Sequence, residues 1–169
     1  GSELIRNLPS AFPKLDIVLM DNLLTQRYCS LFNLPNEGSF KFIEINIVKE
    51  NIEEFFEDVF VVIHLAAITD ATNSFKNKKA IEENNFFATK TVADICLKRK
   101  IKMIYLSSTS VYGTQEDTVD ENCKLENLKP QSPYAKIKLK EEEYLKNLFY
   151  NQRLNFAILR FGTIFGVSP

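Results

Sequence analysis

The feature that most constrains the fold is the alternation of short apolar runs with segments of helical periodicity. The runs have strand length and are rich in β-branched residues; they are DIVLMD (16–21), FKFIEINI (40–47), VFVVIHLAA (59–67), KMIYLSS (102–108) and NFAILRF (155–161). Nearly continuous runs of this kind are typical of strands that are covered on both faces. Helix-like segments, at about 77–99 and 133–151, separate the last three runs. Strand and helix in alternation predict an α/β fold with a parallel sheet and right-handed crossovers.

Composition indicates a globular protein with a small-molecule partner. The chain has 169 residues, of which 45% are hydrophobic, so we expect a single domain over 1–169. Its net charge of -1, from 21 basic and 22 acidic residues spread along the chain, does not indicate binding to a nucleic acid or an anionic membrane. The longest apolar runs reach about half of the roughly 20 residues that cross a bilayer, and no signal peptide is recognisable. We therefore expect a cytoplasmic protein.

Cysteine and histidine are too sparse to support metal or triad chemistry. Cys29, Cys96 and Cys123 are far apart and outside any Cys-x-x-Cys spacing, so the sequence indicates neither disulfides nor a zinc site. His64 is the only histidine, which argues against a Ser-His-Asp triad.

Both ends of the sequence look truncated. Residues 1–8 (GSELIRNL) have helical spacing but follow no strand, and GVSP ends the chain directly after the fifth apolar run. Gly1 and Ser2 are either a cloning remnant or native residues. The long polar segment 112–132 is turn-rich, which indicates a lid or a substrate loop.

The segment SPYAKIK places a tyrosine and a lysine on one face of a helix. Ser132 is a favourable N-cap and Pro133 suits the first helical position, so Tyr134 falls in the first turn and Lys138 one turn later. A neighbouring ammonium and the positive end of the helix both favour the phenolate. We therefore expect the pKa of Tyr134 to lie below its ordinary value of about 10. The alternative is that Tyr134 packs in the core and Lys138 pairs with Glu142.

The segment YLSSTSVYG places hydroxyl groups at the end of a buried strand. Its polar residues are Ser107, Ser108, Thr109 and Ser110. The carboxyl ends of parallel strands are where α/β sheets bind ligands, although a serine-rich strand end can also be only a turn. Together with Tyr134 and Lys138, these hydroxyls indicate a proton relay in which a serine holds a substrate oxygen and the tyrosine exchanges its proton.

A carboxylate and a glycine have the spacing of a nucleotide site. Asp21 ends the first apolar run, about 20 residues after Gly1, and a carboxylate there can accept hydrogen bonds from a ribose diol. Gly1 would then be the last glycine of a phosphate loop. The alternative is that Asp21 is a turn residue, because Asp-Asn is good turn chemistry.

Six segments, taken together, resemble one enzyme family. The segments VLMDNL, VIHLAAITD, ENNFFAT, YLSSTSVYG, SPYAKIK and LRFGTIFG are similar, in order and with fitting gaps, to the extended short-chain dehydrogenase/reductase family, in its NAD-dependent nucleotide-sugar epimerase and dehydratase branch. The resemblance implies a Rossmann-type doubly wound parallel sheet that holds NAD and here lacks its first, central strand. It also implies a carboxyl-terminal substrate domain in a full-length member, and a homodimer formed through two helices.

The resemblance also implies roles for particular residues. Ser108, Tyr134 and Lys138 would be catalytic, Lys138 would also bind the nicotinamide ribose, and Ser110 would join Ser108 and Tyr134 at the substrate. The residues expected along the cofactor are Gly1, Asp21, Asn22, Asn46, Ile47, Leu65, Ala66, Ala67, Ile68, Thr69, Ser107, and Asn84 or Asn85. For the two last asparagines, a polar contact that stabilises the helix is the alternative.

Some positions depart from the family pattern. Members usually have Asp-Ile at Asn46–Ile47 and glycine at Ala88, but an amide can still bind adenine. Dehydratases and decarboxylases carry one or two carboxylates where Thr109–Ser110 stand, so the departure favours epimerisation or carbonyl reduction over dehydration. Epimerases commonly have an asparagine where Gly162–Thr163 stand, which leaves the identity of the sugar open.

Three functional hypotheses follow. The first is a nucleotide-sugar epimerase that oxidises a sugar hydroxyl transiently and returns the keto sugar with inverted stereochemistry. The others are an NAD-dependent reductase of a non-sugar carbonyl and a non-catalytic NAD-binding protein. Asp21 favours NAD over NADP, because its charge repels a 2′-phosphate. We expect these 169 residues alone to bind NAD poorly, to be inactive, and to be either marginally stable or closed by a non-native strand pairing.

Overall fold

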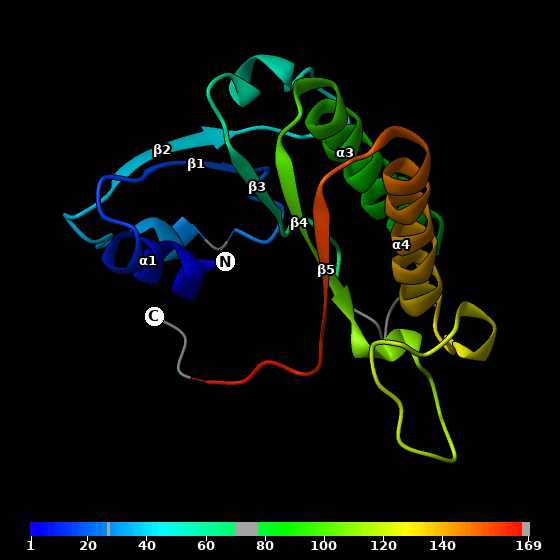
Figure 1. Cartoon of the computed structure of the whole chain (residues 1–169). Helices are drawn as coiled ribbons and strands as arrows, with labels where there is room; N and C mark the ends of the chain where they lie inside the picture. The colour runs from blue at the N-terminus through cyan, green and yellow to red at the C-terminus, as the bar shows by residue number, and fades with distance from the viewer. Residues whose placement is uncertain (27, 70–77, 167–169) are drawn as a thin grey trace. The chain divides into compact units, whose positions relative to one another are not determined.

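The computed structural model describes residues 1–26, 28–69 and 78–166, which form two compact units. Unit 1 comprises Gly1–Asn51 together with residues from 165 onward, and unit 2 comprises Ile52–Ile164. Figure 1 shows their helices and strands in chain order.

Unit 1 is a helix with a two-stranded parallel sheet. It contains α1 (Ser2–Ala11), β1 (Asp16–Asp21), the short 3-10 helix η1 (Tyr28–Leu31) and β2 (Ser39–Glu44). The strands pair in parallel from Asp16 opposite Ser39 to Asp21 opposite Glu44. The guanidinium of Arg6 donates to the backbone oxygens of Asn33 at 2.8 Å and Phe32 at 2.7 Å, which fastens α1 to the loop after η1. The predicted helix at the start of the chain and the predicted strand 16–21 are confirmed.

Unit 2 contains a three-stranded parallel sheet in the order β3–β4–β5. Its strands are β3 (Val61–His64), β4 (Lys102–Ser108) and β5 (Phe156–Phe161), and a 3-10 helix, η2 (Glu53–Phe56), precedes them. β4 has the predicted bounds, whereas β3 and β2 are shorter than the apolar runs that predicted them. All described strand pairs of both units are parallel, and they form two separate sheets, β1–β2 and β3–β4–β5.

Two long helical segments link the strands of unit 2. The first is made of α2 (Lys78–Ile81), a π-helical turn η4 (Glu82–Phe86) and α3 (Phe87–Arg99); its predicted start at residue 77 lies outside the described residues. The second is α4 (Pro133–Gln152), whose first turn is capped by Ser132, because the Oγ of Ser132 accepts a hydrogen bond from the backbone N–H of Ala135 at 3.1 Å. Two 3-10 turns, η5 (Thr109–Val111) and η6 (Leu125–Asn127), lie between β4 and α4.

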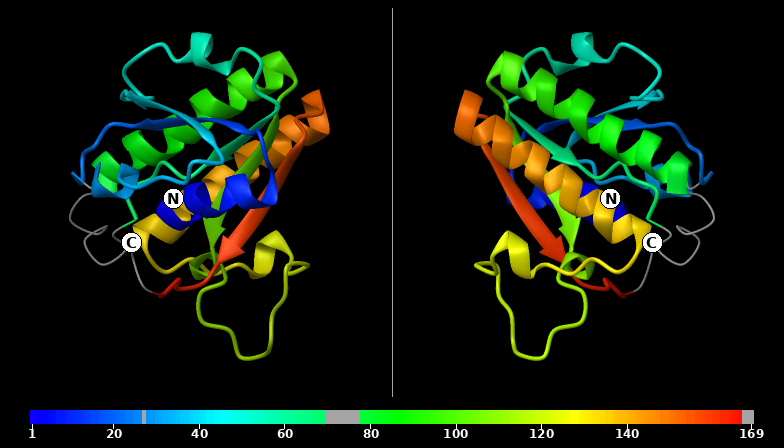
Figure 2. Two further views of the ribbon diagram at one scale, coloured as in Figure 1. Left: turned by 90° about the vertical axis from the view of Figure 1, so that its left-hand side faces the viewer. Right: turned by 90° about the vertical axis from the view of Figure 1, so that its right-hand side faces the viewer.

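Helices α3 and α4 lie side by side against the same face of the β3–β4–β5 sheet, as the two views of Figure 2 show. Strand register places Tyr105 between His64 and Ile158 on that face, and Ser107 opposite Arg160. Side chains at alternate positions of β5, such as Leu159 and Phe161, remain exposed on the other face. Both long helices of unit 2 therefore pack on one side of its sheet, and the expectation of strands covered on both faces stays a prediction.

Two of the helices end on residues whose backbone is left-handed. Lys100 follows α3 with φ of 58°, and Arg153 follows α4 with φ of 63°. A side chain costs about 1 kcal/mol in this conformation, and glycine avoids the cost. We expect Lys100→Gly to raise the free energy of unfolding by about 0.5–1 kcal/mol, measured by urea denaturation. The control is Lys136→Gly inside α4, which should lower it by about 1 kcal/mol; a comparable loss in Lys100→Gly would contradict the expectation.

Candidate active site

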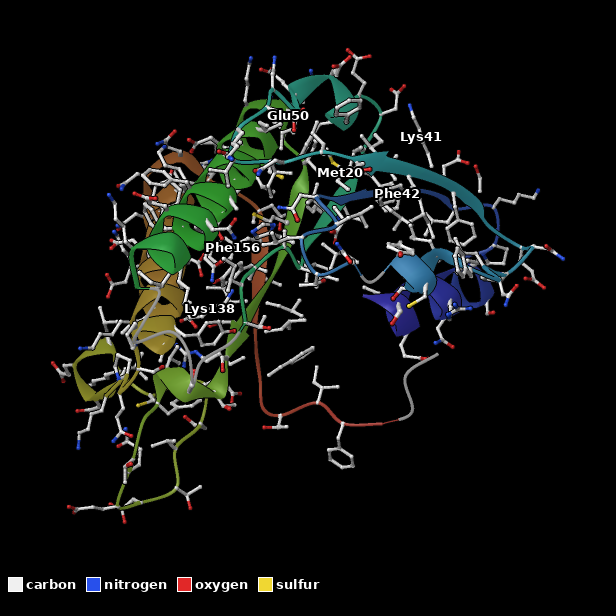
Figure 3. All side chains as sticks on the ribbon, turned by 180° about the vertical axis from the view of Figure 1, so that it is seen from behind. Met20, Lys41, Phe42, Glu50, Lys138 and Phe156 are labelled. Carbon is white, nitrogen blue, oxygen red and sulfur yellow. The ribbon has the colours of Figure 1, made fainter. Side chains whose placement is uncertain are left out.

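Lys138 belongs to α4, and its side chain extends to the carboxyl end of β4; Figure 3 labels it. Its ammonium donates to the backbone oxygen of Leu106 at 3.0 Å and to the hydroxyl of Tyr105 at 3.1 Å. The same nitrogen lies 5.9 Å from the centre of the Tyr134 ring. The docking of α4 on β4 thus brings Lys138 to the carboxyl end of β4, and Tyr134 lies near Lys138 on the same helix.

A buried carboxylate completes the surroundings of Lys138. Glu141, one turn along α4, has no exposed surface, and its Oε2 lies 3.4 Å from the Lys138 nitrogen. The hydroxyl of Tyr105 donates to Oε2 of Glu141, and the hydroxyl of Thr89 on α3 donates to Oε1 at 2.7 Å. Nε2 of His64 lies 3.1 Å from Oγ1 of Thr89. A continuous set of hydrogen bonds therefore runs from β3 through α3 and α4 to β4.

Glu142, the next residue of α4, is buried in a second polar group. Arg160 binds it with two hydrogen bonds, from Nε to Oε1 at 3.0 Å and from Nη2 to Oε2 at 2.7 Å. The hydroxyl of Ser107 donates to Oε1 of Glu142 at 2.6 Å, and Lys146 lies 3.7 Å from Oε2. Lys138 therefore does not pair with Glu142, which was the alternative. Its ion pair is with Glu141, whereas the carboxylate of Glu142 binds Arg160.

The expectation of a lowered pKa for Tyr134 is wrong in this structure. Burial of the phenol raises the pKa of Tyr134, and the negative charge of Glu141 raises it further. Burial also lowers the pKa of Lys138, an effect that Glu141 and Glu142 oppose. The sequence argument counted the ammonium and the helix end, whereas burial and the carboxylate of Glu141 dominate in the fold.

The serines at the end of β4 hold one another. Oγ of Ser108 accepts hydrogen bonds from the backbone N–H of Ser110 at 3.2 Å and from the hydroxyl of Ser110 at 2.9 Å. Ser108 is half-buried and caps η5. With both bonds accepted by Ser108, its own O–H can donate to a further group. Ser107, by contrast, uses its hydroxyl on Glu142.

Asn85 fastens the segment after β3 to the π-helical turn. Its Oδ1 accepts from the backbone N–H of Ile68 at 2.8 Å, and its Nδ2 donates to the backbone oxygen of Ile68 at 3.0 Å. Asn84, which is half-buried, donates to Oδ1 of Asn85 at 3.0 Å. Asn85 therefore positions Ile68 within the segment Leu65–Thr69, and the cofactor contacts of this segment, Asn84 and Asn85 stay predictions.

In unit 1, the predicted ribose ligands form a turn at the end of β1. Oδ1 of Asp21 accepts from the backbone N–H of Leu23 at 2.7 Å, and Oδ1 of Asn22 accepts from that of Leu24 at 3.1 Å. Both Asp21 and Asn22 are exposed at the carboxyl end of the strand. The turn uses one oxygen of each side chain, so it is compatible with a ribose bond to the second carboxylate oxygen of Asp21.

The remaining predicted residues of unit 1 lie in turns or at a helix end. Oδ1 of Asn46 accepts from the backbone N–H of Val48 at 3.1 Å, and Ile47 is half-buried beside it. Gly1 is the N-cap of α1, and its backbone oxygen accepts from the N–H of Ile5 at 3.0 Å. The cofactor contacts of Gly1, Asn46 and Ile47 stay predictions.

The polar segment after β4 lines an open hollow of about 390 Å³. Its lining residues are Thr118, Val119, Asp120, Asn122, Cys123, Lys124 and Asn127, none of which belongs to the predicted site. Among the described residues no cluster of His, Cys, Asp or Glu could hold a metal ion. In the same part of the chain, no helix has both the length and the apolar character to cross a bilayer.

Comparison with known proteins decides the family. The whole chain, residues 1–169, matches the model of the NAD dependent epimerase/dehydratase family. The chain belongs to this family. The resemblance that the six sequence segments carried is therefore confirmed.

Curated relatives include both kinds of enzyme. The chain is 33% identical to a dTDP-D-glucose 4,6-dehydratase of Dictyostelium discoideum, over 98% of this chain and 42% of that protein. It is 32% identical to an uncharacterized UDP-glucose epimerase of Bacillus subtilis, over 81% of this chain and 43% of that protein. The family member described here thus spans less than half the length of these relatives.

Solved structures confirm the Rossmann-type fold. A UDP-N-acetylglucosamine 4-epimerase from Methanobrevibacter ruminantium superposes with a TM-score of 0.84 at 28% identity, covering 95% of this chain and 50% of that one. A UDP-glucuronic acid 4-epimerase from Bacillus cereus, in complex with NAD, gives a TM-score of 0.82 at 27% identity, covering 98% of this chain and 54% of that one.

Buried His64 should make the stability of this family member depend on pH. Burial, with the nearby charge of Lys138, lowers the pKa of His64 to about 3, whereas an unfolded histidine titrates near 6.5. Between these pH values the unfolded chain binds a proton that the folded chain does not, so stability falls as the pH falls. From pH 7 to pH 5 we expect His64 to account for a loss of about 2 kcal/mol in the free energy of unfolding.

The matched variant for this prediction is His64→Gln, since the carboxylates that also titrate are the same in both proteins. Urea denaturation at pH 7 and pH 5 should give a pH dependence about 2 kcal/mol smaller in His64→Gln than in the unmodified chain. Equal pH dependence in the two proteins would contradict the prediction, because it would show that His64 has the same pKa in the folded and the unfolded state.

Proposed function

We propose that the protein to which this chain belongs is an NAD-dependent nucleotide-sugar epimerase that uses Ser108, Tyr134 and Lys138 as a proton relay. The observation that carries the proposal is the hydrogen bond from Lys138 to the backbone oxygen of Leu106, which ties the tyrosine-bearing helix to the end of β4. That strand end carries Ser108, whose hydroxyl bonds to Ser110. A phenol, an ammonium and a hydroxyl suit the exchange of a proton with a sugar oxygen, and the contact of Lys138 with the end of β4 supports their meeting there.

The residues of each unit fit parts of NAD. In unit 1, the exposed carboxylate of Asp21 at the end of β1 suits the adenosine ribose diol. In unit 2, the segment Leu65–Thr69 and the ammonium of Lys138 would hold the nicotinamide half. NAD, when bound, supplies the hydride acceptor and donor of the reaction.

The side chains would divide the proton transfer between them. Tyr134 would take the proton of the sugar hydroxyl while the carbon that carries this hydroxyl is oxidised. It would return the proton after the keto sugar has rotated to present its other face. Ser108 would donate its free hydroxyl proton to the same sugar oxygen and so orient it. The positive charge of Lys138 would stabilise Tyr134 while it is a phenolate.

Epimerisation is favoured over dehydration by the side chains that follow Ser108. Elimination of water needs additional acid and base groups, and Thr109 and Ser110 supply only hydroxyls. The hydroxyl of Ser110 bonds to Ser108, and that of Thr109 lies 3.5 Å from the backbone oxygen of Phe161. The neighbouring carboxylates of Glu141 and Glu142 are buried, and their oxygens are hydrogen-bonded to other side chains of the protein. Dehydration is the second candidate, because the Dictyostelium relative is named as a dehydratase.

Three further proposals concern the whole protein. We propose a nucleotide sugar as the substrate, a homodimer formed through two helices of which α4 is one, and a cytoplasmic location. The exposed rings of Phe149 and Tyr150 near the end of α4 support a helix that packs against a partner copy.

The test of the reaction is product analysis with the full-length protein. Incubated with NAD and a panel of uridine and deoxythymidine diphosphate sugars, it should convert at least one of them to its C4 epimer, detected by proton NMR of the sugar. A 4-keto-6-deoxy sugar would support dehydration instead. Tight NAD binding without any product would leave a non-catalytic NAD-binding protein, and reduction of a non-sugar carbonyl would support the reductase.

The role of Tyr134 predicts a separation of turnover from binding. Tyr134→Phe removes the hydroxyl but keeps the ring, so we expect turnover to fall by about 10²-fold or more, with NAD affinity within about twofold of the unmodified protein. Tyr28→Phe, which removes the same hydroxyl from an exposed ring in η1, is the control and should change neither quantity. Retained turnover in Tyr134→Phe would remove Tyr134 from the mechanism.

A further inference from the structure

Three groups of the protein surround the Lys138 ammonium. The acceptors are the backbone oxygen of Leu106 at 3.0 Å, the hydroxyl of Tyr105 at 3.1 Å and Oε2 of Glu141 at 3.4 Å. Two of the three donors of the ammonium are thus used in hydrogen bonds to Leu106 and Tyr105, and the carboxylate of Glu141 forms an ion pair with it. The side chain of Lys138 is only 5% exposed, and that of Glu141 is not exposed at all. Lys138 is therefore held by a built site rather than by solvent.

The directions of the surrounding hydrogen bonds form a consistent set that ends on Glu141. Tyr105 accepts from Lys138 and donates to Glu141, while Thr89 donates to the other carboxylate oxygen. Because the hydroxyl of Thr89 is used as a donor, Thr89 can only accept from His64, which places the proton of the neutral imidazole on Nε2. Both oxygens of Glu141 thus have a partner in the set, as a buried carboxylate requires.

We propose that Glu141 is a positioning residue for the catalytic lysine: its buried carboxylate, held by Tyr105 and Thr89, keeps the Lys138 side chain charged and directed at the carboxyl end of β4. The proposal deepens the proposed function, on which the catalytic role of Lys138 rests. Glu141 itself lies behind the lysine and touches neither of the groups assigned to the substrate, Tyr134 and Ser108, by any hydrogen bond that the structure shows.

The other charged and titratable groups around Lys138 do not take over this role. His64 on β3 is neutral at physiological pH. Glu142 on α4 is bound twice by Arg160 of β5 and lies 3.7 Å from Lys146. Tyr105 on β4 is a neutral phenol, because burial and the two carboxylates raise its pKa. Glu141 is thus the anion on which the charge of Lys138 chiefly depends.

Glu141 acts on the lysine and on the tyrosine in the same direction. Its negative charge favours the protonated form of Lys138, an ammonium, and it favours the protonated form of Tyr134, a neutral phenol. Neutralising Glu141 should therefore lower the pKa of both groups. In a reaction that needs a phenolate and an ammonium, both limbs of the pH profile should move to lower pH together, whereas loss of structure alone would reduce the rate without moving the limbs.

The test compares Glu141→Gln with the unmodified full-length protein. Gln keeps the size of the side chain and one acceptor oxygen but removes the charge. With lysine labelled by ¹³C at Cε and tyrosine at Cζ, NMR titration should show that the proton affinity of Lys138 falls about tenfold or more and that of Tyr134 falls in the same direction. The lysine and tyrosine signals are assigned with Lys138→Arg and Tyr134→Phe.

Glu143→Gln is the matched control, since it makes the same chemical change two residues further along α4. Both titrations should be unchanged in Glu143→Gln. Unchanged titration of Lys138 in folded Glu141→Gln would overturn the proposal, whether or not the protein turns over a sugar, so the result is independent of the epimerase assay.

A second variant keeps the proposal testable if Glu141→Gln does not fold. Tyr105→Phe leaves the carboxylate in place and removes the hydroxyl that accepts from Lys138 and donates to Glu141. Its Lys138 should also titrate at lower pH, because an acceptor of the charged form is lost. A Lys138 titration that does not move in Tyr105→Phe would overturn the proposed arrangement of Tyr105, Glu141 and Lys138.

Discussion

The fit of α4 onto β4 and β5 depends on two adjacent carboxylates that are buried without any exposed surface. Glu141 faces Tyr105 and Lys138, and Glu142 faces Ser107 and Arg160. A buried carboxylate is costly unless its oxygens are bonded and its charge is matched. Because strand register sets Tyr105 and Ser107 two residues apart on one face, a shift of the helix or the strand would leave both carboxylates without partners. The polar contacts therefore select one docking position, and that position places Tyr134 and Lys138 at the strand end.

The same burial sets the chemistry of the candidate site. Burial raises the pKa of Tyr134 and lowers the pKa values of Lys138 and His64. Burial would also raise the pKa of Glu142, but its hydrogen bonds to Arg160 and Ser107 outweigh this effect and lower it. In this structure the phenol of Tyr134 is protonated at neutral pH. Proton exchange with a sugar would thus need the charge of Lys138 to outweigh that of Glu141 when the reaction proceeds.

Local sequence patterns were sufficient to predict the elements and the helical pair. Apolar runs predicted β1 and β4 with their observed bounds, and Ser132–Pro133 predicted the start of α4. The partners of Glu141 were not predictable, because Thr89 is 52 residues away and Tyr105 is 36 residues away in the sequence, so that only the fold brings them together. The direction of the Tyr134 pKa was predicted wrongly for the same reason, since spacing shows a neighbouring lysine but not burial or a carboxylate behind it. The two hydrogen bonds between Asn85 and the backbone of Ile68 likewise join segments that are distant in the sequence.

The most direct measurement is a crystal structure of the full-length protein with NAD and the nucleotide sugar that it binds. The hydroxyls of Tyr134 and Ser108 should both lie within hydrogen-bonding distance of one sugar oxygen, and the ammonium of Lys138 should lie at the end of β4 with Glu141 behind it. A sugar bound away from this strand end, or a Tyr134 ring turned away from the sugar, would contradict the assignment of these residues to catalysis.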